Sequence, residues 1–203
     1  MSAAPPPIAV HRSLITRVKN ILMQPKSEWQ VIDSEPATVG SIYVGYVLPL
    51  AAIPAICMAI GWSLVGVPFI GTSFGAGWAI RVAVTMYVAS LVRVFVFALI
   101  IDALAPSFGG QKNQIQALKV SAYASTAAWV VGVFYLMPAL SILGILGLYS
   151  LYLLYLGLPT LMKTPSDRAL GYTVVAIIAA IVVSVVFRAI LMRLGGGYAY
   201  GYI

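Results

Sequence analysis

The chain has very few charged residues. Only 8% of its 203 residues are Asp, Glu, Lys or Arg, whereas 62% are hydrophobic, and the mean hydropathy is +1.00. Soluble domains carry roughly 25% charged residues, so a soluble fold of this composition would expose a large apolar surface to water. The composition therefore excludes a soluble protein and favours an all-α, polytopic integral membrane protein, because lipid requires every backbone polar group to be paired internally.

The same scarcity excludes the usual catalytic and metal sites. The chain has one histidine, one cysteine and five acids, which are His11, Cys57, Glu28, Asp33, Glu35, Asp102 and Asp167. This set provides neither a histidine paired with a nucleophile inside the bilayer nor enough ligands for zinc. A single cysteine also forms no intrachain disulfide. We therefore expect a protein that is not an enzyme and that holds no metal or cofactor.

Long runs without charge predict about five membrane-spanning helices. Residues 36–80, 120–162 and 169–187 contain no Lys, Arg, Asp or Glu. A span needs about 20 residues at a rise of about 1.5 Å each, so each of the two longer runs accommodates parts of two helices. The expected spans are 37–61, 78–102, 116–137, 141–162 and 169–191.

The distribution of Lys and Arg predicts the orientation of these spans. With a cytoplasmic N-terminus, the inner side would hold Arg12, Arg17, Lys19, Lys26, Lys112, Lys119, Lys163 and Arg168, and the outer side Arg81, Arg188 and Arg193. Positive residues favour the cytoplasmic side, so we expect the C-terminus outside. The net charge of +7 then indicates attraction to anionic lipids of the inner leaflet. Nucleic acid is not an expected partner, because no loop is long enough to present a basic face.

Residues outside the predicted spans divide into three segments. Residues 1–12 are rich in proline and small residues and are expected to be disordered, and residues 195–203 form a tail of glycine and tyrosine. Residues 13–35 are predicted to form an amphipathic interfacial segment, followed by the five-helix transmembrane domain at 36–194. These limits give the predicted domain organisation.

The segment 13–35 begins with a basic amphipathic helix. Leu14, Val18 and Leu22 fall on one helical face, whereas Arg17 lies on the opposite face. Such a helix lies in the plane of the membrane interface, and Trp29 is then expected at headgroup depth. The alternative interpretation is that this segment packs beneath the helix bundle.

Arg93 is the most unusual residue of the predicted spans. The midplane of span 78–102 falls near Ser90, so Arg93 lies about 4–5 Å from it, where an arginine is costly. One interpretation is that its side chain reaches the inner headgroups. The other is an intramembrane polar site, formed by Arg93 with Tyr149, Tyr152 and a carbonyl released by Pro49.

Several short motifs occur in a characteristic order. They are Ile21-Leu22-Met23-Gln24-Pro25 with Glu28-Trp29, Tyr46-Val47-Leu48-Pro49-Leu50, Asp102-Ala103-Leu104-Ala105-Pro106, Phe108-Gly109-Gly110 with Ala117-Leu118 and Tyr123-Ala124, and Leu156-Gly157-Leu158-Pro159 with Gly171-Tyr172. Together they resemble the Yip-type proteins (Ypt/Rab-GTPase-interacting membrane proteins), in particular their compact bacterial relatives. The resemblance covers roughly residues 20–190. It implies five spans, a cytoplasmic N-terminus and a location in a bacterial inner membrane.

These observations lead to two functional expectations. The first is a non-enzymatic inner-membrane scaffold or membrane-organising factor that contacts the lipid bilayer and other membrane proteins, with a homo-oligomer as a further option. Its expected inner-face interaction residues are Asp102, Pro106, Gly109, Gly110, Lys112 and Trp29. The alternative is a channel or transporter with a polar path around Arg93, Pro49 and Tyr152.

Overall fold

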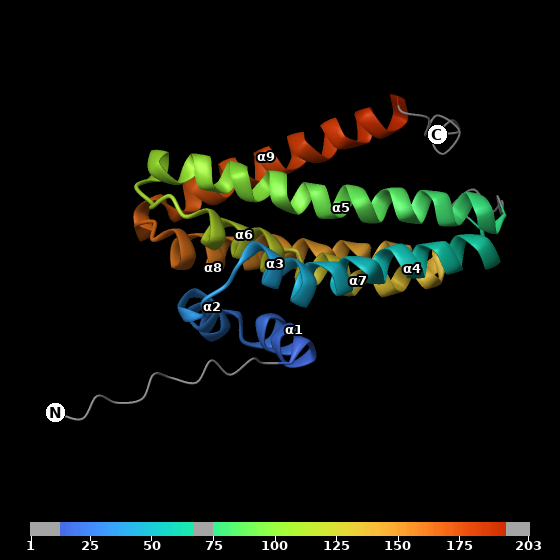
Figure 1. The fold of residues 1–203 in the computed structure, drawn as a ribbon, viewed down its shortest axis with the longest axis horizontal. Coiled ribbons are helices and arrows are strands. Elements are labelled where there is room, and N and C mark those ends of the chain that lie inside the picture. Colours follow the sequence, from blue (N-terminus) through green and yellow to red (C-terminus); the bar gives the residue numbers. More distant parts are fainter. Residues whose placement is uncertain (1–12, 67–74, 194–203) are drawn as a thin grey trace.

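The computed structural model describes residues 13–66 and 75–193, and every regular element within them is a helix (Figure 1). Two short helices come first, α1 (Leu14–Met23) and α2 (Pro25–Ser34). Ser13 begins α1 as an N-cap, because its side chain accepts a hydrogen bond from the Thr16 amide. The all-α fold predicted from composition is confirmed.

Five helical stretches are long and apolar enough to cross a membrane, as the charge-free runs predict. They are Val39–Leu64, Ala76–Phe108, Gln114–Leu136, Ala139–Met162 and Ser166–Ile190. Their elements are α3 (Val39–Ile42), η1 (Tyr43–Val47), α4 (Leu48–Leu64), α5 (Ala76–Leu104), η2 (Ala105–Phe108), α6 (Gln114–Ala124), α7 (Thr126–Val131), η3 (Gly132–Leu136), η4 (Pro138–Leu148), α8 (Tyr149–Met162) and α9 (Ser166–Arg193). The expected limits differ most at the second span, which continues past Asp102 through η2 to Phe108.

The first span contains a local irregularity next to its first proline. Tyr43–Val47 form a π-helical turn, and the Leu48 amide donates to the carbonyl of Tyr43. Pro49 follows directly and has no amide proton to donate. Close to this irregular turn, the Tyr87 hydroxyl of the neighbouring helix α5 donates to the Leu48 carbonyl at 3.2 Å, which joins α4 to α5.

The helices form a bundle in which α5 contacts α4, α6 and α9. Figure 1 shows α9 moving away from α5 toward its carboxyl end. Burial follows this divergence, because Val183 is the last buried residue among the α9 side chains that the structure describes, and Val185, Val186 and Ile190 are exposed. These three side chains therefore face the surroundings of the bundle and not another helix.

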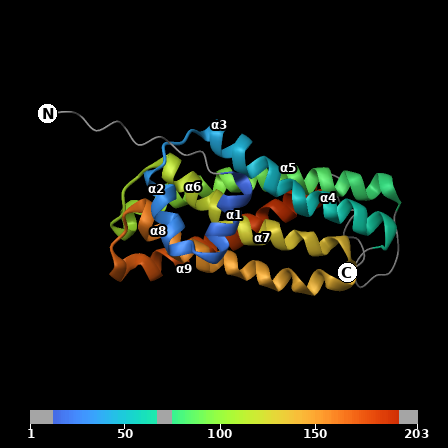
Figure 2. The same ribbon diagram turned by 90° about the horizontal axis from the view of Figure 1, so that it is seen from below.

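Helices α1 and α2 lie across one side of the bundle (Figures 1 and 2). Contacts join α2 to α8 and α1 to α7. Leu14 and Val18 pack against the core formed by the first three spans, and Leu22 packs against the core around α8. The apolar face of α1 therefore packs at least in part against protein, and its position in the plane of the membrane interface stays a prediction.

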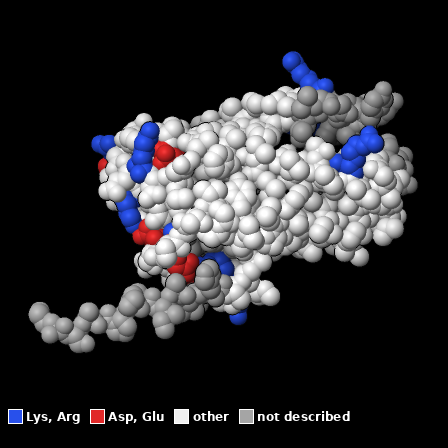
Figure 3. All heavy atoms as spheres, in the orientation of Figure 1, with Lys and Arg blue, Asp and Glu red and all other residues white. Residues whose placement is uncertain are grey.

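Charge is distributed unequally between the two ends of the bundle. On the face shown in Figure 3, acidic side chains gather at one end and over α1 and α2, whereas the other end shows only basic ones. A wide uncharged belt separates them. We call the end with both acidic and basic side chains the charged end. It carries Asp102, Lys112, Lys163, Asp167 and Arg168. The Lys/Arg bias predicts that this end faces the cytoplasm.

The predicted orientation can be tested with topology reporters. An alkaline phosphatase fused after Ile203 should be active, because an odd number of spans places the C-terminus outside. A reporter inserted after Gly110, at the charged end, should report the cytoplasm. Alkaline phosphatase activity at the Gly110 position would reverse the orientation, and a cytoplasmic signal from both positions would contradict five spans.

Candidate functional site

A buried ion-pair network ties the N-terminal helices together. Arg17 Nη1 lies 2.6 Å from Glu28 Oε1, and Arg17 Nη2 pairs with Glu35. Asn20 Nδ2 donates to the other oxygen of Glu28 at 3.2 Å, and the guanidinium lies 5.8 Å from the ring centroid of Tyr123. Arg17 and Glu28 are only 6% and 2% exposed. We call Arg17, Glu28, Glu35, Trp29 and Tyr123 the N-terminal clasp.

The charge of Arg17 is secured by its partners. Burial lowers the pKa of Arg17, but the hydrogen bond and the charge of Glu35 outweigh it, and the pKa lies above its ordinary value. The guanidinium therefore stays protonated, and the network does not depend on a titration of Arg17 at neutral pH. A buried pair of this kind is strongly destabilised when one partner is removed, because the other charge stays buried without compensation.

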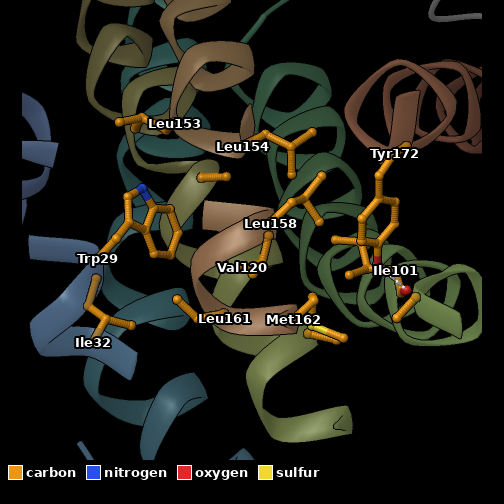
Figure 4. Close-up of a cluster of buried hydrophobic side chains, with 14 of the residues drawn as sticks. Trp29, Ile32, Ile101, Val120, Leu153, Leu154, Leu158, Leu161, Met162 and Tyr172 are labelled. Atoms are coloured by element: carbon orange, nitrogen blue, oxygen red, sulfur yellow. Dashed lines mark hydrogen bonds between the residues drawn. The ribbon is translucent and has the colours of Figure 1, made fainter. Parts of the chain in front are cut away.

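Trp29 is fully buried between α2 and α8. Figure 4 shows its indole beside Ile32 and directed toward the helix that carries Leu153, Leu158 and Leu161. A Cβ atom added at Gly157 would lie 2.7 Å from Trp29 Cζ2, so the indole requires the missing side chain at this position. The edge of the indole meets Tyr123 at a centroid distance of 6.3 Å. Trp29 therefore contacts protein and not lipid headgroups, because Gly157 opens a slot for its indole.

Polar contacts attach the end of α2 to the bundle. Lys119 Nζ donates to the carbonyls of Ile32 and Glu35 at 2.7 and 2.6 Å. A cation at the last carbonyls of a helix also interacts favourably with its dipole. Asp33 accepts from Gln116 at 3.0 Å and pairs with Lys163 at 2.5 Å. These contacts connect α2 to the third and fourth spans at once.

The loop after α5 forms part of the same end of the bundle. Gly109 has φ +72°, a left-handed conformation that favours glycine. The Gly110 amide donates to the Ala105 carbonyl at 2.8 Å, and the Gln111 amide donates to the Met162 carbonyl at 2.8 Å. A Cβ on Gly110 would lie 2.7 Å from Thr164 Oγ1. The loops that precede α6 and follow α8 are therefore packed directly against each other.

The structure brings five of the predicted inner-face residues to the charged end. Pro106, Gly109 and Lys112 are exposed and Gly110 is half-buried. Asp102 is also half-buried, and its Oδ1 has no hydrogen-bond partner among the described residues. Trp29, the sixth predicted residue, is buried in the clasp and contributes no surface.

A cavity of about 580 Å³ lies between the spans, and Arg93 forms part of its wall. Its lining comes from all five spans and is mainly apolar, but it includes six serines, which are Ser90, Ser121, Ser125, Ser141, Ser150 and Ser184. Their hydroxyls are a polar feature that the sequence analysis missed, because serine is common in such helices and has no fixed spacing here.

The other residues grouped with Arg93 in the predicted polar site do not line this cavity. The Tyr149 hydroxyl donates to the Leu22 carbonyl at 3.0 Å, Tyr152 is exposed, and Pro49 is exposed at the start of α4. Arg93 therefore shares the cavity wall with the six serines, whereas Tyr149 and Tyr152 lie outside it. Among residues 13–66 and 75–193, no group of three His, Cys, Asp or Glu side chains is arranged to hold a metal ion.

Comparison with known proteins agrees with this architecture. The chain is similar to the inner membrane protein YohC of Escherichia coli K12, with 28% identity over 195 residues, which cover 93% of this chain and 98% of that protein. The protein of the same name from Escherichia coli O6:H1 matches with the same values. No solved structure matches.

The motifs that resemble Yip-type proteins account for several aromatic contacts of the clasp and of the bundle. The rings of Tyr46 and Tyr123 lie 4.3 Å apart, those of Phe108 and Tyr172 stack at 5.0 Å, and Trp29 occupies the slot at Gly157. The model of the Yip1 domain matches residues 19–187, a region that contains all of these contacts. With its five apolar helices and N-terminal helices in place, the chain belongs to the Yip1 domain family.

Proposed function

We propose that this multi-pass protein is a non-enzymatic scaffold of a bacterial inner membrane, and that the charged end is its partner-binding surface. The observation that carries the proposal is the assembly of this end from distant segments. The loop after α5 bonds to the end of α8 through Gln111 and Met162, and Lys163 links the same region to Asp33 of α2. A surface that is organised in this way before binding loses little conformational entropy when a partner docks.

The chemistry of the exposed side chains indicates the kind of partner. Lys26 on α2 and Lys112 at this end are exposed and form no ion pair among the described residues. Lys163 and Arg168 are also exposed, and each pairs with one acid, Asp33 and Asp167 respectively. A surplus of accessible positive charge favours an acidic segment of another membrane protein, presented close to the anionic lipids of the inner leaflet. We therefore expect electrostatics to dominate recognition at this surface.

Site-specific photo-crosslinking tests this proposal. A photoreactive amino acid at Lys112 should capture a partner in native membranes, whereas the same amino acid at Val84, an exposed residue on the apolar part of α5, should not. Lys112→Glu combined with Arg168→Glu should lower partner recovery at least about tenfold through reversed charge. The melting temperature should hardly change, because both side chains are exposed. Equal capture from Lys112 and Val84, or full recovery with the double variant, would contradict the proposal.

A further inference from the structure

Arg93 lies in the middle of the apolar belt. On α5 it is separated by about 18 Å from Arg81 and by about 13.5 Å from Asp102, at a rise of about 1.5 Å per residue. Within residues 13–66 and 75–193 it forms no ion pair, and it lines the cavity. A guanidinium at this depth is costly and is generally retained for a function. Its position creates a demand for negative charge inside the cavity.

Two serines in the cavity wall are arranged as hydrogen-bond donors. Ser90, one helical turn before Arg93, accepts a hydrogen bond from Trp129 Nε1 at 3.4 Å. Ser150 accepts one from the Ala128 amide at 3.1 Å. Because each hydroxyl oxygen is already engaged as an acceptor, its proton is available to a group in the cavity. Ser121, Ser125 and Ser184 differ, since each donates its proton to a backbone carbonyl.

The remainder of the wall is suited to a hydrocarbon chain. Met58, Trp62 and Met86 line the cavity on one side of Arg93 along the spans, and Phe97 and Leu154 line it on the other. The volume of about 580 Å³ lies within the usual range of about 300–1,000 Å³ for sites that enclose small ligands. Three cavity-lining residues, Ala180, Val183 and Ser184, belong to α9, close to the point where this helix leaves the bundle.

We propose that the cavity binds a single-chain anionic amphiphile drawn from the surrounding membrane. The carboxylate or phosphate head accepts hydrogen bonds from the Arg93 guanidinium and from the hydroxyls of Ser90 and Ser150. The acyl chain lies against the apolar wall. The head supplies the negative charge that the described part of the protein does not offer to Arg93, and the amphiphile enters from lipid beside α9, whose Ala180, Val183 and Ser184 line the cavity. This site is independent of partner binding at the charged end.

Tryptophan quenching provides a direct measurement, because Trp62 and Trp129 line the cavity. Dibromostearate added to the full-length protein in neutral detergent at pH 8 should quench the fluorescence of these residues through contact with the bromines. Oleate should displace it, whereas uncharged oleyl alcohol should not. Lysophosphatidate serves as a second competitor: the preferred head is a carboxylate if oleate displaces the probe at the lower concentration, and a phosphate if lysophosphatidate does.

Variants of Arg93 decide whether the charge is responsible. Arg93→Gln should weaken dibromostearate binding about ten- to hundredfold, as expected when charge-assisted hydrogen bonds are lost. Arg81→Gln, on the same helix but outside the cavity, should bind like the wild type. Ala180→Phe keeps Arg93 and fills the cavity, so it should also abolish binding. The melting temperature of each variant reports its fold. Absence of quenching in the wild type, equal displacement by oleyl alcohol, or unchanged binding by a folded Arg93→Gln variant would overturn the proposal.

Discussion

Replacement of Gly157 by valine is expected to expel Trp29 from its slot and to detach α2 from the bundle. The added Cβ alone would lie 2.7–2.9 Å from three atoms of the indole, and the indole cannot bend away from it. Loss of a buried tryptophan from a core costs about 3–5 kcal/mol, so the docking of the N-terminal helices should be largely lost. The five spans should remain inserted, because they do not depend on this contact for their apolar burial.

Cysteine labelling measures this detachment. Ile32, 1% exposed on α2, is replaced by cysteine in a Cys57→Ser background, and maleimide labelling should accelerate at least about tenfold with Gly157→Val. Gly144→Val is the matched control in the same span, because the nearest atom to its added Cβ is the Tyr135 hydroxyl at 3.9 Å. If labelling of Ile32→Cys is equally slow in the Gly157→Val and Gly144→Val variants, Gly157 does not determine the position of Trp29.

Arg17→Met is expected to produce the second large effect. It leaves the buried carboxylate of Glu28 without the compensating charge of Arg17, and it also removes the ion pair of Glu35. Breaking a buried ion pair in this way costs about 3–5 kcal/mol, whereas removing both charges is often neutral. The double variant Arg17→Met, Glu28→Leu should therefore recover much of the loss. Glu35 is more exposed and can turn toward water.

Thermal unfolding in detergent gives the relevant comparison. Lys26→Met removes an exposed positive charge from the neighbouring helix and should change the free energy of unfolding by no more than about 0.5 kcal/mol. Arg17→Met should lower the melting temperature and accelerate labelling of Ile32→Cys. A double variant as unstable as Arg17→Met would show that packing of the arginine, and not its charge, stabilises the clasp.

The five spans could be predicted because lipid imposes a simple rule on sequence. A helix that crosses about 30 Å of hydrocarbon must be long and nearly uncharged. The charge-free run from Glu35 to Arg81 and the one from Lys119 to Lys163 express that rule directly. The 3-10 geometry of η3 and η4 could not be predicted from this rule, because hydropathy is insensitive to helix type. The helical part of the fold was thus accessible from composition, whereas its local geometry was not.

The clasp was harder to predict because amphipathicity does not identify what an apolar face contacts. The pattern of Leu14, Val18 and Leu22 fits a lipid interface and a protein core equally well. Gly157 and Lys119, which hold the adjoining helix α2 on the bundle, lie far away in the sequence. Glu28 and Arg17 are close in the sequence, but only the bend between α1 and α2 brings their charges together in space.

Arg93 illustrates the same division within the membrane. The energetic cost of a charge near the midplane identified the residue, but the identity of its neighbours depends on how five helices are rotated. Tyr149 and Tyr152 appeared suited to Arg93 by depth, yet Tyr149 turns toward α1. Serines of α5 and of other helices line the cavity wall instead, and nothing in their sequence context distinguishes Ser90 or Ser150 from serines that face lipid.

The long sequence separation of the contacts made by α1 and α2 has a consequence for biosynthesis. Leu22 and Tyr149 are 127 residues apart, and Asp33 and Lys163 are 130 residues apart. During translation the two helices therefore emerge well before the span that receives them, and non-local contacts of this kind form late. Until α8 is inserted, Leu14 and Val18 can pack against the first three spans, but Leu22 and Trp29 have no helix to receive them. Docking onto the bundle is then a final maturation step, which a ribosome-bound chain that ends before Gly157 cannot complete.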